Sequence, residues 1–382
     1  PLGGLTGDLG PASVLIGCDQ AAVRMVITAP AHLDPDCIYT AGFDVVATDA
    51  VLDCRGARIE SGAGSGRGVL IRTDAHTPLE RVTVRNCIVG GFLNNVRVTR
   101  DGFKQLDPAL ADLNATADIL IENSVLHDSA GSGIFVDGYV RDVTLQDLHI
   151  TRSGSVGIYL EAGSHHHTVQ RNHVVANGWK ENGPDGQTFE LAGQTFRWWG
   201  TGREGLAIDG SYDNVVRHNL FERNEAGAIF LYKNCGEFAT ERPEQHWTRV
   251  TPAARNLIEH NTIIEEQVGI WVGSRMAENQ LFMDCSDPAY VSDALTRLHE
   301  DAAPDNVVRN NDLHDVQYGI RVEDDATFVG QNRFRGDDPS QLAVLVGTRH
   351  RTRQLGRPVR NTVVMANDAE ITDSTHPYRW VH

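Results

Sequence analysis

Apolar and polar residues alternate in short stretches that recur along most of this chain. The phrase Val-Thr-Val-Arg-Asn-Cys-Ile-Val at 82–89 returns as Ile-Leu-Ile-Glu-Asn-Ser-Val-Leu at 119–126 and as Val-Val-Arg-His-Asn-Leu-Phe-Glu at 215–222. A period of two is typical of half-buried strands, and the 3.6-residue period of a helix is hard to find. The pattern therefore predicts an all-β protein made of short strands.

Asparagine or aspartate closes each copy of the phrase at a regular spacing. The uninterrupted steps, from Asn123 to Asp147 to Asn172 and from Asn311 to Asn332, are about 21–25 residues long. That length matches one coil of three short strands with turns rather than a helical repeat. We expect these positions to line an internal turn, where side-chain amides hydrogen-bond from coil to coil.

The repeat resembles that of the pectate-lyase-like superfamily of right-handed parallel β-helices, over roughly residues 51–370. The resemblance implies a solenoid of about ten coils, each buried against its neighbours. Residues 1–50 would then form an N-terminal cap and 371–382 a C-terminal tail. This superfamily includes lyases, epimerases, glycoside hydrolases, phage tailspikes and structural solenoids, so the fold does not by itself give the function.

Each coil also carries a strand led by a glycine, as in Gly133-Ile-Phe-Val-Asp and Gly157-Ile-Tyr-Leu-Glu. Side chains alternate across a strand, so the second and fourth residues point inward and the third and fifth outward. Outward neighbours on successive coils lie about 4.8 Å apart. One face is therefore predicted to stack Phe135, Tyr159, Ala207 and Trp271 beside Asp137, Glu161 and Asp209, with Lys233 and Arg275 farther along.

Three long insertions, 178–204, 236–254 and 276–304, interrupt the repeat beside this face. Long loops on one side of a rigid scaffold usually build a binding cleft. Their aromatic and basic residues suit a carbohydrate, because sugar rings stack on indole and carboxylates pair with guanidinium. The predicted substrate-binding residues are Arg197, Trp198, Trp199, Arg203, Trp247 and, on the strand face, Trp271.

The leading interpretation is β-elimination or C5-epimerisation of a uronic-acid polysaccharide. Such an enzyme needs a base, a group that neutralises the uronate carboxylate, and an acid. The set resembles the Lys/Arg arrangement with calcium-holding acids of some β-helical lyases, although the Asp-Pro-His-Asp motif of alginate epimerases is missing. The proposed roles are Lys233 as base, Arg275 as neutralising group, Tyr159 or His165 as acid, and Glu161 with Asp209 holding Ca²⁺ or polarising the site.

A glycoside hydrolase that uses two of Asp137, Glu161 and Asp209 is the second interpretation. Glu161 and Asp209 on neighbouring coils would lie about 5 Å apart, as in a retaining enzyme. Asp137 and Asp209, two coils apart, would be roughly 10 Å apart, as in an inverting one. The sequence leaves both pairs open. A glycan-binding solenoid without catalysis is the third interpretation.

Three adjacent histidines, His165, His166 and His167, suggest a metal site at first sight. Adjacent residues in a strand or turn alternate in direction, however, so all three cannot reach one ion. In the repeat, His167 aligns with Asn214. We therefore expect His167 to occupy a structural turn position.

Charge and cysteine content narrow the partners and the compartment. With 34 Lys and Arg against 51 Asp and Glu, the net charge of −17 disfavours nucleic acid and anionic membrane surfaces. No apolar run approaches the roughly 20 residues of a membrane helix. Six cysteines without a CxxC motif favour disulfides in a secreted or periplasmic protein. Cys235 and Cys285, each beside an insertion, are the favoured pair. The oligomeric state stays open.

Overall fold

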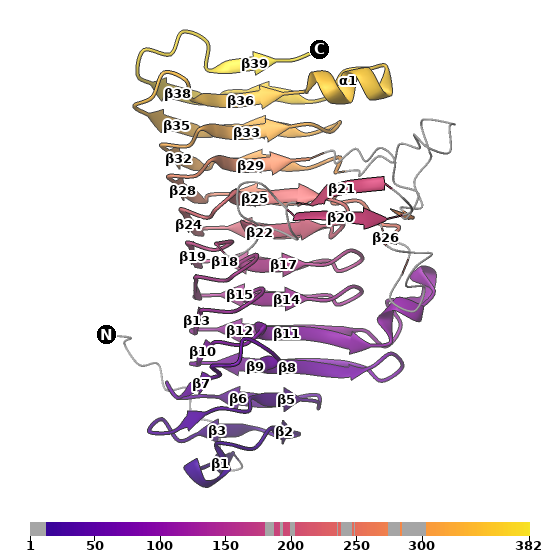
Figure 1. Ribbon diagram of the computed structural model, residues 1–382, viewed down its shortest axis with the longest axis vertical. Helices are drawn as coiled ribbons and strands as arrows, with labels where there is room; N and C mark the ends of the chain where they lie inside the picture. Colours follow the sequence, from indigo (N-terminus) through magenta and orange to yellow (C-terminus); the bar gives the residue numbers. More distant parts are fainter. Residues whose placement is uncertain are drawn as a thin grey trace.

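The computed structural model describes residues 13–179, 187–191, 194–198, 203–234, 236–237, 247, 249–273, 283–284 and 303–382. Its coils succeed one another from β1 at one end of an elongated stack to β39 at the other (Figure 1). Three long parallel sheets, here called A, B and C, run along this stack. The predicted all-β, right-handed parallel β-helix is confirmed.

Sheet A consists of β1 (Val14–Ile16), β3 (Ala31–Leu33), β6 (Val51–Asp53), β9 (Leu79–Arg85), β12 (Thr116–Glu122), β15 (Val143–Gln146), β18 (Thr168–Gln170), β23 (Val215–Arg217), β27 (Leu257–Glu259), β31 (Val307–Arg309), β34 (Phe328–Gly330) and β37 (Val363–Met365). Sheet B consists of β2 (Met25–Ile27), β5 (Phe43–Val45), β8 (Arg67–Asp74), β11 (Asn94–Asp101), β14 (Ile134–Val136), β17 (Ile158–Leu160), β22 (Glu204–Asp209), β25 (Gly227–Tyr232), β29 (Val268–Val272), β33 (Tyr318–Val322), β36 (Leu342–Val346) and β39 (Tyr378–Trp380). Sheet C consists of β4 (Ile38–Tyr39), β7 (Arg58–Glu60), β10 (Ile88–Gly90), β13 (Val125–His127), β16 (His149–Thr151), β19 (His173–Val175), β24 (Leu220–Glu222), β28 (Thr262–Ile264), β32 (Asp312–His314), β35 (Arg333–Gly336) and β38 (Asp368–Ile371).

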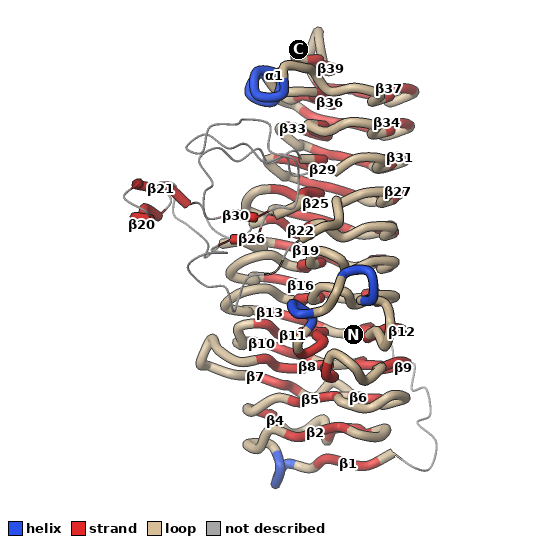
Figure 2. Tube along the Cα trace, turned by 90° about the vertical axis from the view of Figure 1, so that its right-hand side faces the viewer, coloured by secondary structure: helices blue, strands red, loops and turns tan. Residues whose placement is uncertain are grey.

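Two small antiparallel pairs lie within the insertions. The first insertion contains β20 (Gln187–Leu191) and β21 (Gln194–Trp198), and this hairpin projects from one side of the stack (Figure 2). The second and third insertions meet where β26 (Gly236–Glu237) pairs with β30 (Met283–Asp284). Four short helices complete the described elements: η1 (Cys18–Gln20), η2 (Phe103–Gln105), η3 (Pro108–Leu110) and α1 (Arg349–Leu355). None of the helices in the described chain has the length and apolar character of a membrane span.

The sheets extend beyond the range that the repeat indicated. Strands β1 to β5 lie within residues 1–50, where a cap was expected, and β39 lies within the expected tail 371–382. These terminal coils form the same ladders as the rest. The N-terminal coils lack the complete asparagine-ended phrase on which the predicted boundary depends, and β39 belongs to the coil whose phrase ends at Asn367.

The core is a continuous stack of inward side chains. In sheet B, the inward residue that follows each leading glycine pairs in register with its counterpart on the next coil. It is the second residue counted from that glycine, as the alternation predicted, except after Gly227, where it is the third. All are fully buried: Ile134, Ile158, Leu206, Ile229, Ile270 and Ile320. Each coil therefore buries its apolar face only against its neighbours, which fixes the outward face as rigidly as the core.

The predicted asparagine ladder is present between sheets A and C. The backbone N–H of Asn172 donates to Oδ1 of Asn219 at 3.0 Å, and Asn219 donates in the same way to Asn261 at 3.1 Å. The side-chain Nδ2 groups repeat these bonds from coil to coil, which satisfies the buried amides. The ladder continues through Asn311, Asn332 and Asn367.

In the first coils, the residues predicted for the ladder lie one position before the ladder itself. Asn123 and Asp147 occupy the preceding left-handed position, with φ of 49° and 54°. The ladder place itself is held by Ser124, whose Oγ accepts from Cys87 N, and by Leu148, whose N donates to Asn172. Asparagine and aspartate tolerate the left-handed conformation, so both positions favour the same residue types and the sequence does not separate them.

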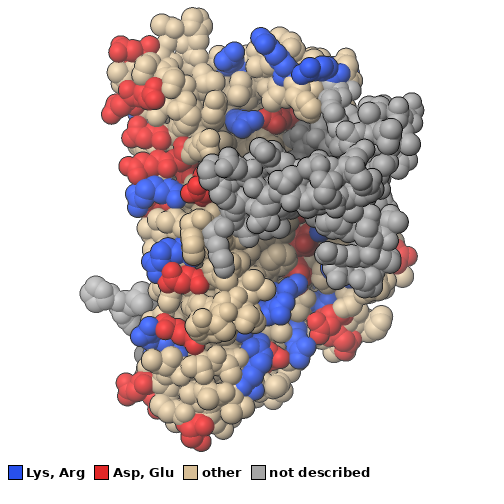
Figure 3. All heavy atoms as spheres, viewed as in Figure 1, with Lys and Arg blue, Asp and Glu red and all other residues tan. Residues whose placement is uncertain are grey.

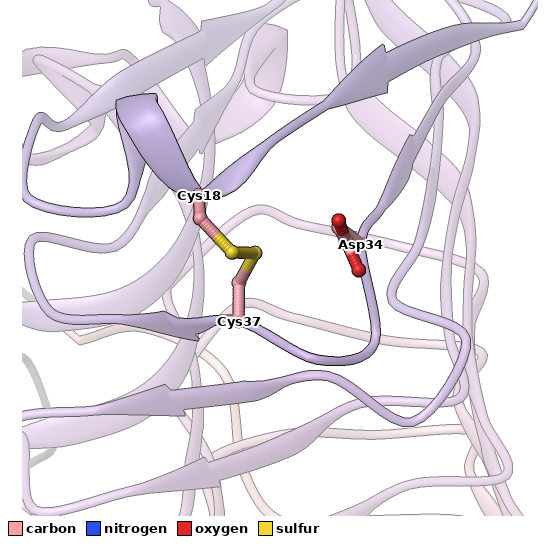
Figure 4. Close-up of side chains that lie close together, drawn as sticks. All are labelled: Cys18, Asp34 and Cys37. Atoms are coloured by element: carbon pink, nitrogen blue, oxygen red, sulfur yellow. A yellow bond between two sulfur atoms is a disulfide. The ribbon is translucent and has the colours of Figure 1, made fainter.

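Two disulfides join the first coils: Cys18–Cys37 and Cys54–Cys87, with Cα atoms 5.2 and 4.8 Å apart. Asp34 lies beside the first one (Figure 4). In the described chain, Cys18, Asp34 and Cys37 are the only three His, Cys, Asp or Glu side chains whose ligand atoms lie within 4.8 Å of one another. Both sulfurs are consumed by the disulfide, so this is not a metal site. The favoured Cys235–Cys285 pair lies outside the described residues and stays a prediction.

Candidate active site

The predicted outward row on sheet B is confirmed. Phe135 pairs with Tyr159, and Tyr159 with Ala207, on successive coils. Phe230, which the prediction passed over, fills the row between Ala207 and Trp271. The Phe135 and Tyr159 rings stack with centroids 4.7 Å apart and planes at 14°. Phe230 meets Trp271 edge-on at 5.3 Å. The row thus offers aromatic surface on both sides of the small Ala207.

Three carboxylates form the neighbouring row, here called the carboxylate row. Asp137 follows β14, Glu161 follows β17, and Asp209 ends β22, and these three strands are consecutive in sheet B. Their exposed fractions are 1%, 7% and 0%. Three buried acids on adjacent coils require protons, cations or hydrogen-bond donors to be stable.

The next member of this row is Tyr232, not Lys233. In the register of β22 with β25, Asp209 pairs with Tyr232, and Lys233 follows one position later. The prediction counted outward positions from Gly227, but Gly227 pairs with Glu204, so the counting is shifted by one residue on this coil. Lys233 is nevertheless buried, with 1% of its surface exposed, between Tyr232 and Asn234.

Asp209 is held by a dense set of donors. The Tyr159 hydroxyl donates to Oδ2, and Asn234 donates through its backbone N to Oδ1 at 2.6 Å and through Nδ2 to Oδ2 at 2.9 Å. Burial and the negative charge of Glu161 raise the pKa of Asp209 to about 6, against the opposing effects of Arg249 and these donors. Burial and the charge of Asp209 also raise the pKa of Tyr159 well above its usual value.

Glu161 is paired with an arginine from the second insertion. Arg249 Nε donates to Glu161 Oε1 at 3.2 Å, and the backbone N of Ala162 donates to the same oxygen at 3.1 Å. Burial alone would lower the pKa of Arg249, but the charges of Glu161 and Asp209 outweigh it and raise that pKa. Oε2 of Glu161 receives no hydrogen bond from the described residues.

Asp137 forms an ion pair with a second arginine, Arg97. Arg97 Nε and Nη2 donate to its two oxygens at 2.8 and 2.9 Å, a bidentate pair. Burial raises the pKa of Asp137 and Arg97 opposes that effect. Both oxygens of Asp137 therefore face the Arg97 guanidinium, and the two side chains form a buried ion pair.

Trp247 supports Arg249 and does not offer a free ring to a sugar. It is 5% exposed, and its ring packs against Phe103 at 5.2 Å, Tyr139 at 5.5 Å and the Arg249 guanidinium at 5.2 Å. This corrects the prediction that Trp247 stacks on substrate. An aromatic residue in an insertion can face the scaffold as easily as the cleft, and sequence does not show which.

His165 also turns to a structural partner. Its Nε2 lies 2.9 Å from Oδ1 of Asp112, and its ring stacks on Tyr212 with centroids 4.8 Å apart. Asp112 belongs to the loop after β11 that also carries η2 and η3, and Arg100 holds this loop through the carbonyls of Ala111 and Leu113. These contacts indicate that His165 fixes the loop rather than serving as the acid.

The expectation for His167 is confirmed. Its backbone N donates to Asn214 Oδ1 at 2.8 Å, and its Nδ1 accepts from Val143 N at 3.2 Å. Burial lowers the pKa of His167 to about 3, so the ring is neutral and takes the place of a ladder asparagine.

A family model described as the right-handed beta helix region matches residues 67–281, more than half of the 382 residues. The chain belongs to this right-handed beta helix family. No curated protein matches it. Among solved structures, this β-helix is similar to the A-modules of two mannuronan C-5 epimerases of Azotobacter vinelandii. For AlgE6 the TM-score is 0.59 at 14% identity, over 95% of this chain and 84% of that one. For AlgE4 it is 0.55 at 13%, over 95% and 85%.

A lacto-N-biosidase of Eubacterium ramulus, classed GH136, is similar with a TM-score of 0.50 at 10% identity, over 94% of this chain and 62% of that one. At such identities the likeness shows the fold alone. The chemistry of this β-helix has to be argued from its own site.

Several predicted site residues lie outside what the structure describes. Arg275 and Trp199 are not in the described residues, and Arg197 and Trp198 are described only as backbone positions on β21. Two others are placed. Arg203 is half-buried, with its backbone N donating to Glu204 Oε2 at 2.7 Å. Trp271 is half-buried on the sheet B face, and its Nε1 has no partner in the described chain.

The carboxylate oxygens of Glu161 and Asp209 are poorly arranged to bind Ca²⁺. One oxygen of Glu161 already accepts from Arg249, and both oxygens of Asp209 accept from Tyr159 or Asn234. Calcium prefers six to eight oxygen ligands, several of them carboxylate oxygens that face the ion. Arg249 supplies the positive charge that a cation would otherwise bring.

Sequence reasoning missed Arg97, Asn234 and Arg249. Arg97 pairs in register with Phe135 and could have been found by extending the outward row one coil earlier. Asn234 follows the strand whose register was shifted. Arg249 lies in an insertion, where no repeat indicates direction.

Proposed function

We propose that this chain is a carbohydrate-active enzyme that hydrolyses glycosidic bonds with Glu161 and Asp209. One observation carries the proposal: two adjacent carboxylates have different partners, Arg249 for Glu161, and Tyr159 with Asn234 for Asp209. Burial raises the pKa of Asp209 to about 6, whereas Glu161 pairs with Arg249. Neighbouring carboxyl groups with such opposite environments are the acid and the anionic partner of many glycosidases.

In the proposed mechanism, protonated Asp209 donates its proton to the glycosidic oxygen as the bond to the leaving sugar breaks. Glu161 attacks the anomeric carbon through Oε2, the oxygen that no described residue occupies, and forms a glycosyl–enzyme ester. Asp209 then deprotonates a water that releases the sugar. Neighbouring coils suit the short carboxyl separation of a retaining enzyme. Arg249 holds Glu161 in an ion pair, and Tyr159 and Asn234 orient Asp209.

The substrate class rests on the aromatic row and on analogy. Phe135, Phe230 and Trp271 are half-buried on the same face, where sugar rings could stack. The similar structures are named as mannuronan C-5 epimerases and as a lacto-N-biosidase, which supports a glycan as partner. The two disulfides support export, to the outside of the cell or the periplasm.

Elimination or C5-epimerisation of a uronate glycan is the second candidate, and one contact favours it. The Tyr159 hydroxyl donates to Asp209, and Asn234 Nδ2 lies 3.3 Å from the same hydroxyl, which is a chain suited to proton transfer at a sugar carbon. We place elimination or epimerisation second because Lys233 does not lie in the outward row, and Arg275 lies outside the described residues.

The experiment is a product assay on a panel of neutral and acidic glycans, with Asp209→Asn as the inactive variant. Exposed Asp147→Asn serves as the control. We expect new reducing ends without the ultraviolet absorbance of an unsaturated uronate, and loss of these reducing ends in Asp209→Asn but not in Asp147→Asn. Rising absorbance would replace hydrolysis by elimination. Product-free binding would leave a glycan-binding solenoid, and proton NMR of the recovered polymer would detect epimerisation.

A further inference from the structure

Arginines gather on sheet B on the N-terminal side of the carboxylate row. Figure 3 shows blue side chains over the coils of β5, β8 and β11, below the grey atoms in that view. Arg24 precedes β2, Arg67 begins β8, Arg72 lies within β8, and Arg97 lies within β11. This cluster contrasts with the net charge of −17 of the whole chain.

Three of these arginines have carboxylate partners. Arg24 Nε donates to Asp44 at 2.7 Å, Arg72 lies 3.2 Å from the same Asp44, and Arg97 holds Asp137. Their positive charges are therefore largely compensated. They form the surroundings of the fourth arginine and not its partners.

Arg67 differs from them. No carboxylate oxygen of the described chain forms an ion pair with its guanidinium, and its Nε is buried without a hydrogen-bond partner there. The side chain is half-buried beside like charges. Burial and the neighbouring Arg97 lower the pKa of Arg67, while Asp137 opposes the shift. Buried polar groups in folded proteins are almost always paired, so an arginine of this kind calls for an explanation.

A bound anion would pair the Nη groups of this guanidinium, because Nε is its only atom among the buried atoms without a partner. A guanidinium presents its donors as a rigid planar fork that matches carboxylate or sulfate, and such charge-assisted bonds are strong where water is partly excluded. A structural arginine would be expected to find a carbonyl or carboxylate within the protein, as Arg100 does with Ala75 and Ala111. Arg67 has the donors of an anion site without an internal acceptor.

We propose that Arg67 binds an anionic group of the glycan, a carboxylate or a sulfate ester, at a subsite on sheet B. The inference deepens the proposed function, because it takes the glycan to lie along this face, and it names an acidic glycan as the substrate. The coil of β8 lies two coils from that of β14 and four from that of β22. At about 4.8 Å per coil, the subsite is displaced along the stack by roughly 10 Å from Asp137 and 19 Å from Asp209, several sugar units from the reacting bond. Arg67 lies at the start of its strand, whereas the carboxylates lie at the ends of theirs.

The test is calorimetric binding of an oligouronate, a sulfated oligosaccharide and a neutral oligosaccharide. The parent is Asp209→Asn, so that turnover does not interfere. We expect Arg67→Met to weaken binding of an anionic oligosaccharide by roughly 10- to 100-fold, with neutral binding unchanged. The two anionic ligands distinguish carboxylate from sulfate. Arg67→Lys keeps the charge without the fork and should recover part of the loss.

Arg58→Met is the matched control. It removes an arginine from the same coil on sheet C, where Arg58 is exposed and paired with Glu60. Equal losses in both variants, no loss in Arg67→Met, or no binding of either anionic ligand by the parent would each overturn the proposal. The melting temperature of Arg67→Met should not fall, because no described partner is lost, and a clear drop would point to a structural role instead.

The binding outcome is separate from that of the proposed hydrolysis. If no glycan is cleaved but Arg67→Met still loses anionic binding, the subsite stands and the hydrolase does not. If neutral glycans are cleaved and Arg67→Met binds as the parent does, the hydrolase stands and the subsite does not.

Discussion

Two polar columns run along this solenoid and are built in opposite ways. The asparagine ladder between sheets A and C is neutral, and each amide accepts from the coil before and donates to the coil after it. The carboxylate row on sheet B repeats with the same coil spacing but carries charge. Its partners include Arg97 and Tyr159 from the repeat and Arg249 from an insertion.

The difference separates scaffold from chemistry. A stack of amides satisfies itself and can be extended indefinitely, so it needs no help from the loops. A stack of buried acids is unstable unless something compensates it, and compensation leaves individual groups with shifted pKa values. Changes in the first column should therefore alter stability, and changes in the second should alter activity.

The largest expected effect is on the carboxylate row. Glu161→Gln should lower turnover by roughly 10³-fold or more, because the nucleophile is lost. The melting temperature should change little, since glutamine still accepts from Arg249 and Ala162. Glu122→Gln, on sheet A beside Gln146, is the control and should retain full activity. An active Glu161→Gln would remove Glu161 from the mechanism.

The ladder should respond in the opposite way. Asn219→Leu removes bonds to Asn172, Asn261 and the carbonyl of Val169 and leaves buried groups unpaired. We expect a loss of about 3–5 kcal/mol in the free energy of unfolding, measured by denaturant titration. The fraction that stays folded should keep its activity per molecule. Exposed Gln267→Leu provides the matched control, and equal destabilisation by both would contradict the ladder account.

Trp247 links the row to its insertion. Trp247→Ala should lower kcat/KM by roughly 10- to 100-fold, because Arg249 loses the ring that positions it. Loss of this positive charge near Asp209 should also move the falling limb of the pH profile to higher pH, which simple destabilisation would not do. Trp247→Phe should recover part of the activity. A normal profile in Trp247→Ala would show that Arg249 needs no such support.

Glu266 is a carboxylate inside an amide column and tests the comparison directly. It accepts from Asn224 at 2.8 and 3.1 Å, in the place where an asparagine would stand. Burial raises the pKa of Glu266 to about 8. The folded state therefore binds the proton more tightly than the unfolded state does. Its contribution to stability is complete below the ordinary glutamate pKa and is lost as pH rises to about 8, by up to about 1.4 kcal/mol per pH unit.

Glu266→Gln should remove this pH dependence and raise the melting temperature near pH 8. Exposed Glu265→Gln on the same turn should leave the slope unchanged. If the slope survives in Glu266→Gln, then Glu266 is not the group that titrates.

The smallest expected effect is that of chelation. Arginine already compensates the carboxylate row, so EDTA should leave turnover unchanged. Loss of activity with EDTA and recovery with Ca²⁺ would restore the calcium site that the sequence suggested at Glu161 and Asp209.

The sequence predicts the scaffold because each coil repeats the same local rule. The stacked interior of Ile134 and Ile158, the ladder from Asn172 onward and the outward row at Tyr159 all follow from period two and coil length. Counting from the leading glycine fails on the Gly227 strand, which has one more residue before its first inward position. On this strand the place beside Asp209 is therefore taken by Tyr232 and not by Lys233.

The partners of the carboxylates are harder to predict. Arg249 and Trp247 come from an insertion whose path no repeat determines, and His165 points to Asp112 on a separate loop. Their roles depend on contacts between segments far apart in sequence. Such contacts leave no periodic trace in the chain.

We propose above all that Asp209 reacts as an acid beside Glu161, which Arg249 holds in an ion pair. The most direct test is the pH dependence of kcat/KM on a cleaved glycan. We expect kcat/KM to fall as pH rises through about 6, where Asp209 loses its proton. Asp209→Asn should abolish the activity. A kcat/KM that rises through about pH 6 would make Asp209 a base and contradict the account.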